Sequence, residues 1–196
     1  MKKIIFMIVL FCLALPAYAH VAVKPNEVGI GSFQTFTIGV PVEKDVPTVG
    51  LRILIPAGLE HVSPNVKPGW KITIKKDSDA PDAKVTEIEW TGGVIPSGQR
   101  DDFFFSAKAT STPYTLQWKA YQNYQDRSVV AWTLSSSEQP KKEDGSPDFS
   151  KFGPYSETNI VDDLSDKSST GNTSFFVSII ALVISFIALM KSRKNG

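Results

Sequence analysis

Apolar and polar residues alternate in short runs through the middle of this chain, and no long segment repeats with the period of a helix. The alternating runs cover residues 35–40, 51–55, 70–75, 88–90, 103–107, 116–121 and 129–134. Turn-forming residues separate them, at Pro56-Ala57-Gly58, Lys67-Pro68-Gly69, Gly92-Gly93 and Pro96-Ser97-Gly98. Period-two alternation is typical of half-buried antiparallel strands. The pattern predicts an all-β domain over residues 20–134, an antiparallel β-sandwich with a single core.

A continuous apolar run precedes the alternating region. Ile4–Leu15 follows two lysines and is closed by Pro16 and the small residues of Ala17-Tyr18-Ala19. This is the arrangement of a secretory signal peptide that is cleaved after Ala19. We expect residues 1–19 to be removed; an uncleaved N-terminal anchor is the alternative.

A second apolar run lies near the other end, from Phe175 to Met190, and the basic residues Lys191, Arg193 and Lys194 follow it. A run of this length predicts a transmembrane helix over residues 174–190, and the basic tail 191–196 is expected to stay in the cytoplasm. An amphipathic or core helix would need a polar face, which this run lacks. The chain is therefore expected in the cell membrane as a single-pass protein with an extracytoplasmic domain.

Residues 135–173 connect the domain to the second run and are rich in Ser, Lys, Asp, Gly and Pro. Few apolar side chains are available there to form a core, which predicts a flexible tether. Phe152, Tyr155 and Ile160 are the side chains that could dock on the domain and give the tether partial order.

The amino-acid composition limits which partners and which metals the domain can bind. Without five basic residues of the two ends (Lys2, Lys3, Lys191, Arg193 and Lys194), the 21 basic and 20 acidic residues become 16 and 20, a net charge of −4. This balance does not suggest a nucleic-acid partner. The lone cysteine lies in the predicted leader, and no methionine lies in the domain. A metal bound by the domain must therefore use nitrogen and oxygen donors.

No nucleophile elbow, P-loop, dinucleotide fingerprint or zinc-protease motif occurs, so we expect no enzyme. The two histidines are His20 and His61. Cleavage after Ala19 would give His20 a free α-amine beside its imidazole. Both groups deprotonate near neutral pH, and together they can chelate Cu(II). The alternative is a frayed N-terminus that happens to begin with histidine.

Six sequence stretches resemble a known family. They are His20-Val21-Ala22-Val23-Lys24-Pro25, Val40-Pro41-Val42-Glu43-Lys44-Asp45, Pro68-Gly69-Trp70, Ile88-Glu89-Trp90-Thr91-Gly92-Gly93 with Ile95-Pro96 and Gly98, Phe105-Ser106-Ala107, and Val129-Val130-Ala131-Trp132-Thr133. In this order they resemble the YcnI-like bacterial copper-binding domain. The residues before the last stretch, Asp126-Arg127-Ser128, depart from the glycine often found there.

The resemblance implies a cupredoxin- or immunoglobulin-like sandwich that binds one Cu(II) per domain. The implied site is a single-histidine brace made by the amine and imidazole of His20, with Trp132 beside the metal. Glu43 is the candidate carboxylate, either as an oxygen ligand or as a hydrogen-bond partner of a ligand. Trp132 as core filler and Glu43 as a surface charge are the alternatives. Trp70 and Trp90 are expected in the core.

Three functions remain open. We favour a membrane-anchored Cu(II)-binding protein of copper homeostasis, which receives or delivers copper for a membrane copper transporter. A copper oxidase resembling polysaccharide monooxygenases would need a second histidine in the brace, and His61 is the candidate for it. A metal-free interaction module is the third possibility.

Overall fold

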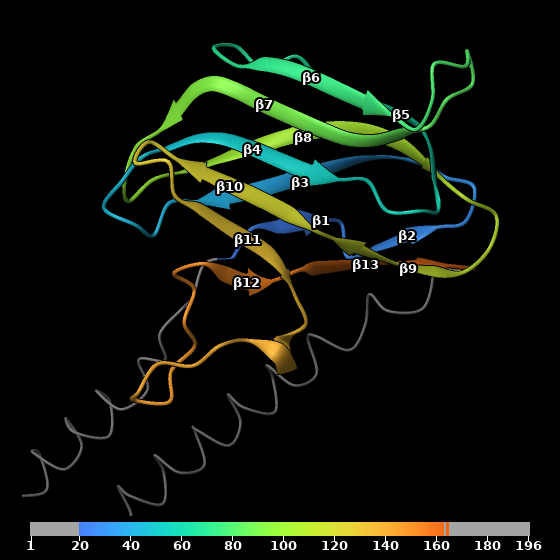
Figure 1. The fold of residues 1–196 in the computed structure, drawn as a ribbon. Helices are drawn as coiled ribbons and strands as arrows, with labels where there is room; N and C mark the ends of the chain where they lie inside the picture. The colour runs from blue at the N-terminus through green and yellow to red at the C-terminus, as the bar shows by residue number, and fades with distance from the viewer. Residues whose placement is uncertain (1–19, 163, 165–196) are drawn as a thin grey trace, which may run out of the picture.

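The computed structural model describes residues 20–162 and 164, and almost all of them belong to strands or short connections (Figure 1). One sheet has the order β1 (Ala22–Lys24), β3 (Phe33–Pro41), β8 (Arg100–Ala109) and β5 (Leu59–Pro64), all antiparallel. The predicted all-β architecture is confirmed. Within the described ranges, no helix has the length and apolar character needed to cross a membrane.

A second sheet contains six strands. Its order is β12 (Phe152–Pro154), β11 (Val129–Leu134), β10 (Ala120–Tyr124), β4 (Thr48–Leu54), β7 (Val85–Ile95) and β6 (Lys71–Lys76). Every pair is antiparallel except β11 with β12, which run parallel. A third sheet, β2 (Glu27–Gly29), β13 (Ser156–Val161) and β9 (Tyr114–Trp118), closes the lower side of the sandwich in Figure 1.

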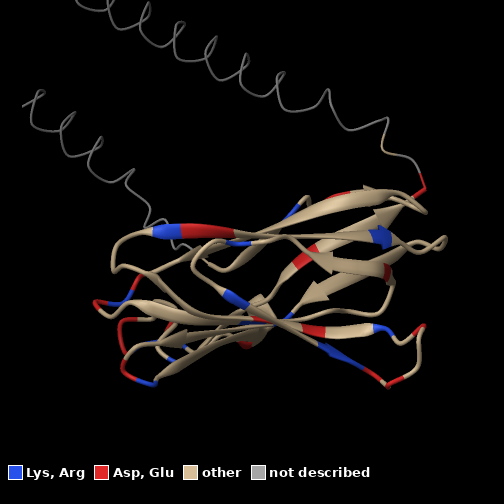
Figure 2. Cartoon of the chain, turned by 90° about the horizontal axis from the view of Figure 1, so that it is seen from above, with Lys and Arg blue, Asp and Glu red and all other residues tan. Residues whose placement is uncertain are grey.

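The core lies between the four- and six-stranded sheets, because alternate residues of each strand point inward. From the four-stranded sheet, Phe36, Phe103 and Phe105 are fully buried, and from the six-stranded sheet so are Leu51 and Trp90. The Trp90 and Phe103 rings meet across the core with centroids 5.3 Å apart. Apolar burial on both sheets holds the layers together. The remaining surface carries interspersed basic and acidic residues in the view of Figure 2.

Two details of the predicted strand map are corrected. Gly92 and Gly93 were expected to form a turn, yet both lie inside β7, where the pairing with β4 shifts register. The predicted strand over 116–121 is divided at Lys119: β9 pairs with β13, whereas β10 joins β4 and β11. A continuous alternation of side chains does not reveal that a strand changes sheets at a single residue.

The predicted boundary at residue 134 is also corrected. After a short 3-10 helix at Ser136–Glu138, the chain forms β12 and β13 within the segment expected to be a tether. Ile160 docks in the core, with 2% of its surface exposed. Backbone pairing with β11, β9 and β2 organises the segment, so few apolar side chains are required. Residues 163 and 165–173 of the predicted tether, the predicted leader and the predicted span lie outside the described residues.

Candidate metal centre

His20 lies two residues before the start of β1, at the edge of the four-stranded sheet. Ala22 pairs with Gly39 of β3, so two residues earlier the chain is level with the end of β3 at Pro41. Glu43 follows Pro41 by two residues and is exposed. The antiparallel pairing therefore brings together two residues that are well separated in sequence.

The imidazole of His20 is partly buried, and its environment changes its basicity. Burial lowers the pKa of His20, while the negative charge of Glu43 opposes this with a smaller effect. The neutral imidazole, which is the form that binds metals, is consequently favoured. The effect of Glu43 also indicates that its carboxylate lies near the ring.

Trp132 lies on β11 and contacts His20 from the other sheet, with ring centroids 5.7 Å apart. Its side chain is 3% exposed. The indole Nε1 donates a hydrogen bond of 3.2 Å to Oε1 of the fully buried Gln122. Gln122 in turn donates to the carbonyl of Pro41 at 2.8 Å and to Thr48 Oγ1 at 2.7 Å. One side chain thus ties Trp132 to the strand end that precedes Glu43.

The ring of Phe149 also packs beside His20 and Trp132, a contact that the sequence did not indicate. This ring lies 4.8 Å from that of His20, edge to face, and 6.1 Å from that of Trp132. Gly153 of β12 leaves room for the tryptophan, because a Cβ at this position would overlap the indole of Trp132. The three rings of His20, Trp132 and Phe149 therefore form one aromatic cluster.

Within the described part of the chain, no group of three His, Cys, Asp or Glu side chains converges on a possible metal position. One donor atom is nevertheless free to act as a ligand. Nδ1 of His20 is buried and has no hydrogen-bond partner among the described residues. An unpaired buried nitrogen is unfavourable, and a metal ion would satisfy it. The donor set fits a Cu(II) chelate that combines this nitrogen with the main-chain nitrogen of the same residue.

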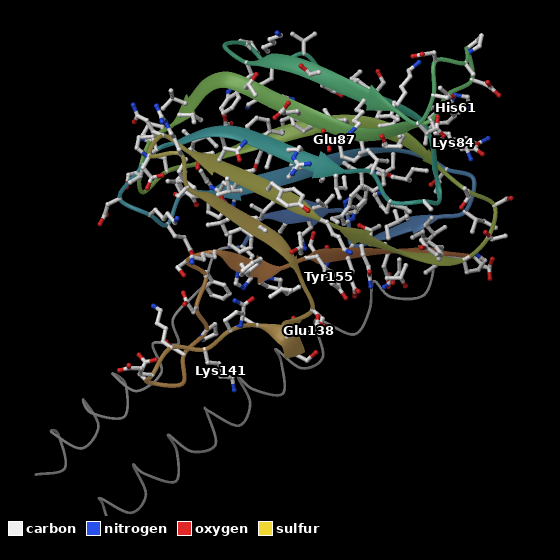
Figure 3. All side chains as sticks on the ribbon, viewed as in Figure 1. His61, Lys84, Glu87, Glu138, Lys141 and Tyr155 are labelled. Carbon is white, nitrogen blue, oxygen red and sulfur yellow. The ribbon has the colours of Figure 1, made fainter. Side chains whose placement is uncertain are left out.

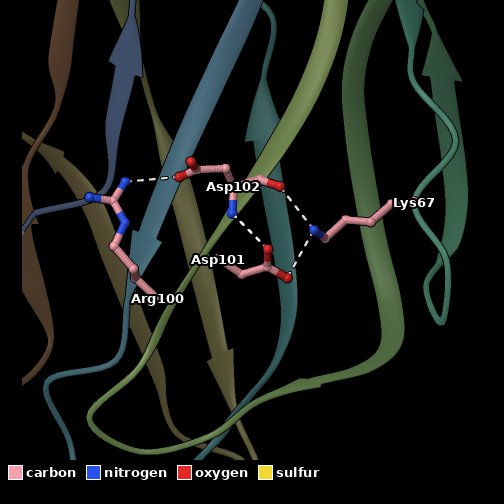
Figure 4. Close-up of polar contacts among 4 residues, drawn as sticks. All are labelled: Lys67, Arg100, Asp101 and Asp102. Atoms are coloured by element: carbon pink, nitrogen blue, oxygen red, sulfur yellow. Dashed lines mark hydrogen bonds and ion pairs between the residues drawn. The ribbon is translucent and has the colours of Figure 1, made fainter.

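A cavity of about 270 Å³ adjoins His20 and gives it access to solvent. Lys24 and Arg100 are among its lining residues. Arg100 Nη2 is held 2.8 Å from Asp102 Oδ1, and Lys67 bonds Asp101 in the same network (Figure 4). The Asp101–Asp102 pair at the start of β8 therefore neutralises nearby cations.

His61 does not belong to this cluster. It lies on β5 between the pairs Glu60–Lys108 and Ser63–Ser106, whereas His20 is level with Arg100 at the opposite end of β8. Six residues of strand separate these positions, which corresponds to about 20 Å. Figure 3 shows His61 beside Lys84 at one end of the sandwich, far from Lys141 in the loop that carries Phe149.

Comparisons with known proteins agree on family and fold. The chain is 32% identical over 194 residues to "Copper-binding protein CutI" of Bacillus subtilis (strain 168), covering 91% of this chain and 89% of CutI. A Nocardia farcinica protein, whose crystal structure is described as an immunoglobulin-like fold, superposes with a TM-score of 0.54. It is 22% identical, over 72% of this chain and 98% of that chain. The sandwich is therefore immunoglobulin-like.

Residues 20–150 match the family described as "Domain of unknown function (DUF1775)". This range begins at His20 and includes Glu43, Trp132 and Phe149. Together with the similarity to CutI over most of both chains, the match identifies the group to which the sequence motifs pointed: the chain belongs to the DUF1775 family of YcnI-like proteins.

Proposed function

We propose that the domain binds one Cu(II) ion through the α-amine and Nδ1 of His20, after cleavage behind Ala19. The observation that carries the proposal is the buried Nδ1 of His20, which has no hydrogen-bond partner among the described residues. The name of CutI as a copper-binding protein supports the choice of metal.

The surrounding residues have distinct tasks in this proposal. Trp132 covers one side of the imidazole and excludes water, while its hydrogen bond to Gln122 fixes the indole. Glu43 supplies negative charge near the ring, either as an oxygen ligand or as a partner of the amine. Burial lowers the pKa of the imidazole and so reduces the competition between protons and copper.

Copper is cargo in this proposal, and the protein is not an enzyme. The cavity beside His20 supplies a route by which copper can enter and leave. A histidine brace of the oxidase type would require His61, which lies at the other end of β8. We therefore infer a role in copper homeostasis, with delivery to a membrane copper transporter by an extracytoplasmic protein anchored through residues 174–190.

The decisive experiment compares two forms of the secreted chain, one beginning at His20 and one with a single alanine added before it. Mass spectrometry establishes each N-terminus, and calorimetry measures Cu(II) binding at neutral pH. We expect one Cu(II) per chain for the first form and at least a hundredfold weaker binding for the second, because the amine becomes an amide. Equal affinities would contradict the brace. His61→Ala is the matched control and should bind as the unmodified protein does.

A further inference from the structure

The loop between the 3-10 helix and β12, residues 139–151, has a defined shape. The backbone N–H of Asp148 donates to the carbonyl of Pro140 at 2.7 Å, and that of Lys142 donates to Ser146 at 2.8 Å. The side chain of Gln139 donates to the carbonyls of Asp148 and Phe152, both at 2.8 Å. These hydrogen bonds join the two ends of the loop and fix the backbone position of Phe149.

The end of the loop is bonded to the six-stranded sheet. The N–H of Ala131 donates to the carbonyl of Lys151 at 2.8 Å, and Gly153 is the direct neighbour of Trp132 in the β11–β12 pairing. Strand pairing therefore sets the distance of Phe149 from the tryptophan. The ring of Phe149 is packed on the core and reaches the imidazole of His20.

We propose that Phe149 is a positioning residue of the copper site, holding the imidazole of His20 in its chelating orientation and slowing the loss of copper. This inference rests on the proposed function. An imidazole on a chain terminus can rotate about two side-chain bonds, and each must be fixed before Nδ1 and the amine face one metal ion. The planes of Trp132 and Phe149 are inclined to the imidazole by 57° and 68°, so the two rings together restrict its rotation.

Phe149 also completes the exclusion of water. The cavity beside His20 is open, whereas Nδ1 itself is buried. Because the Phe149 ring lies 4.8 Å from the imidazole, its removal should let water or a competing chelator approach the bound metal more easily. The rate of copper loss should therefore depend on this ring more than the stoichiometry does.

The test compares Phe149→Leu, which keeps apolar volume but removes the ring, with Phe149→Tyr, which keeps the ring. All variants are processed chains that begin at His20. Copper loss is followed by stopped-flow mixing with excess chelator, and paramagnetic resonance records the Cu(II) environment. An aromatic pair contributes about 0.5–1.5 kcal/mol, so the leucine variant should lose copper about two- to tenfold faster with an altered spectrum. The tyrosine variant should restore the original rate and spectrum.

Phe152→Ala is the matched control, since Phe152 lies on β12, is 42% exposed and lines a different cavity. It should change neither rate nor spectrum. Proton resonances of the His20 imidazole in the metal-free protein give a second readout, because nearby rings shift them. We expect Phe149→Leu to move them and Phe152→Ala to leave them in place.

The outcomes separate the two ideas. If the chain beginning at His20 binds no Cu(II), the proposed function fails, and the imidazole resonances still decide whether Phe149 positions His20. If copper binds but Phe149→Leu leaves rate, spectrum and resonances unchanged, the positioning role is wrong while the proposed function stands.

Discussion

Two tryptophans near opposite edges of the six-stranded sheet each pack against a glycine, but the other side chains that contact their rings differ. Trp132 of β11 lies over Gly153, and Trp70, just before β6, lies over Gly93 of β7. At both glycines a Cβ would overlap the indole ring. Glycine allows a large flat ring to approach the backbone of a neighbouring strand closely. We call this contact between an indole and a glycine a glycine seat.

The difference lies in what contacts the rest of each ring. Trp70 packs edge-on against Phe103 of the core, with centroids 5.0 Å apart, and Lys67 lies 4.5 Å above that phenylalanine. Trp132 contacts His20 and Phe149 and is bonded to Gln122. A glycine seat thus fixes an indole, and the neighbours of the ring decide whether it serves the core or the candidate copper site.

The largest effect that separates the two seats is expected from Gly153→Ala. The added methyl group must displace a tryptophan that is only 3% exposed. We expect a loss of about 3 kcal/mol in the free energy of unfolding and weaker Cu(II) binding. Urea denaturation and calorimetry measure the two quantities.

Gly93→Ala is the matched change at the other seat. Trp70 is less deeply buried and can swing outward, so we expect a loss of about 2 kcal/mol. Copper binding should be unaffected. An equal loss of copper affinity in both variants would show that general destabilisation, and not the position of Trp132, controls the site.

The next effect concerns Gln122, the polar partner specific to the Trp132 seat. Gln122→Met removes an acceptor from Trp132 Nε1 and a donor from Pro41 and Thr48, all without exposing them to water. Unpaired buried groups of this kind cost about 2 kcal/mol in stability. Indole fluorescence should change along with the denaturation midpoint. Unchanged fluorescence would mean that the glycine seat alone orients the ring.

The smallest effect on stability is expected from Trp132→Phe. A buried phenyl ring keeps most of the packing, and the loss of one hydrogen bond to Gln122 corresponds to about 1 kcal/mol. The Cu(II) spectrum should nevertheless shift, because the ring beside His20 becomes smaller. Trp70→Phe is the control and should leave the spectrum as it was. If the Trp132→Phe spectrum matches that of the parent, Trp132 is core filler.

Sequence patterns predicted the sandwich because side-chain alternation reports burial directly. The same pattern carried a signal for Gln122: the alternation of Leu116, Trp118 and Ala120 continues to this residue, which places its side chain inside. A polar residue on an inward position requires a buried partner, which is a clue to a functional neighbour. That partner could not be identified without the pairing of β10 with β11.

Phe149 and Gly153 could not be found in this way. They lie in a polar segment whose order comes from backbone hydrogen bonds and parallel pairing, and these leave no side-chain period. His20, Glu43 and Trp132 were identified through resemblance. The structure brings His20 and Trp132 into contact and indicates that Glu43 is near, and Phe149 completes the group.

The start of β1 is also bound to the last part of the fold. The N–H of Val23 donates to Ser156 Oγ, 133 residues later, at 3.0 Å, and Asn159 donates to the carbonyl of Asn26. Synthesis proceeds from the N-terminus, so a growing chain presents His20 long before Trp132, Phe149 and β13 exist. A nascent or prematurely ended chain therefore carries the histidine without its surroundings, and only the finished domain can hold copper in the proposed manner.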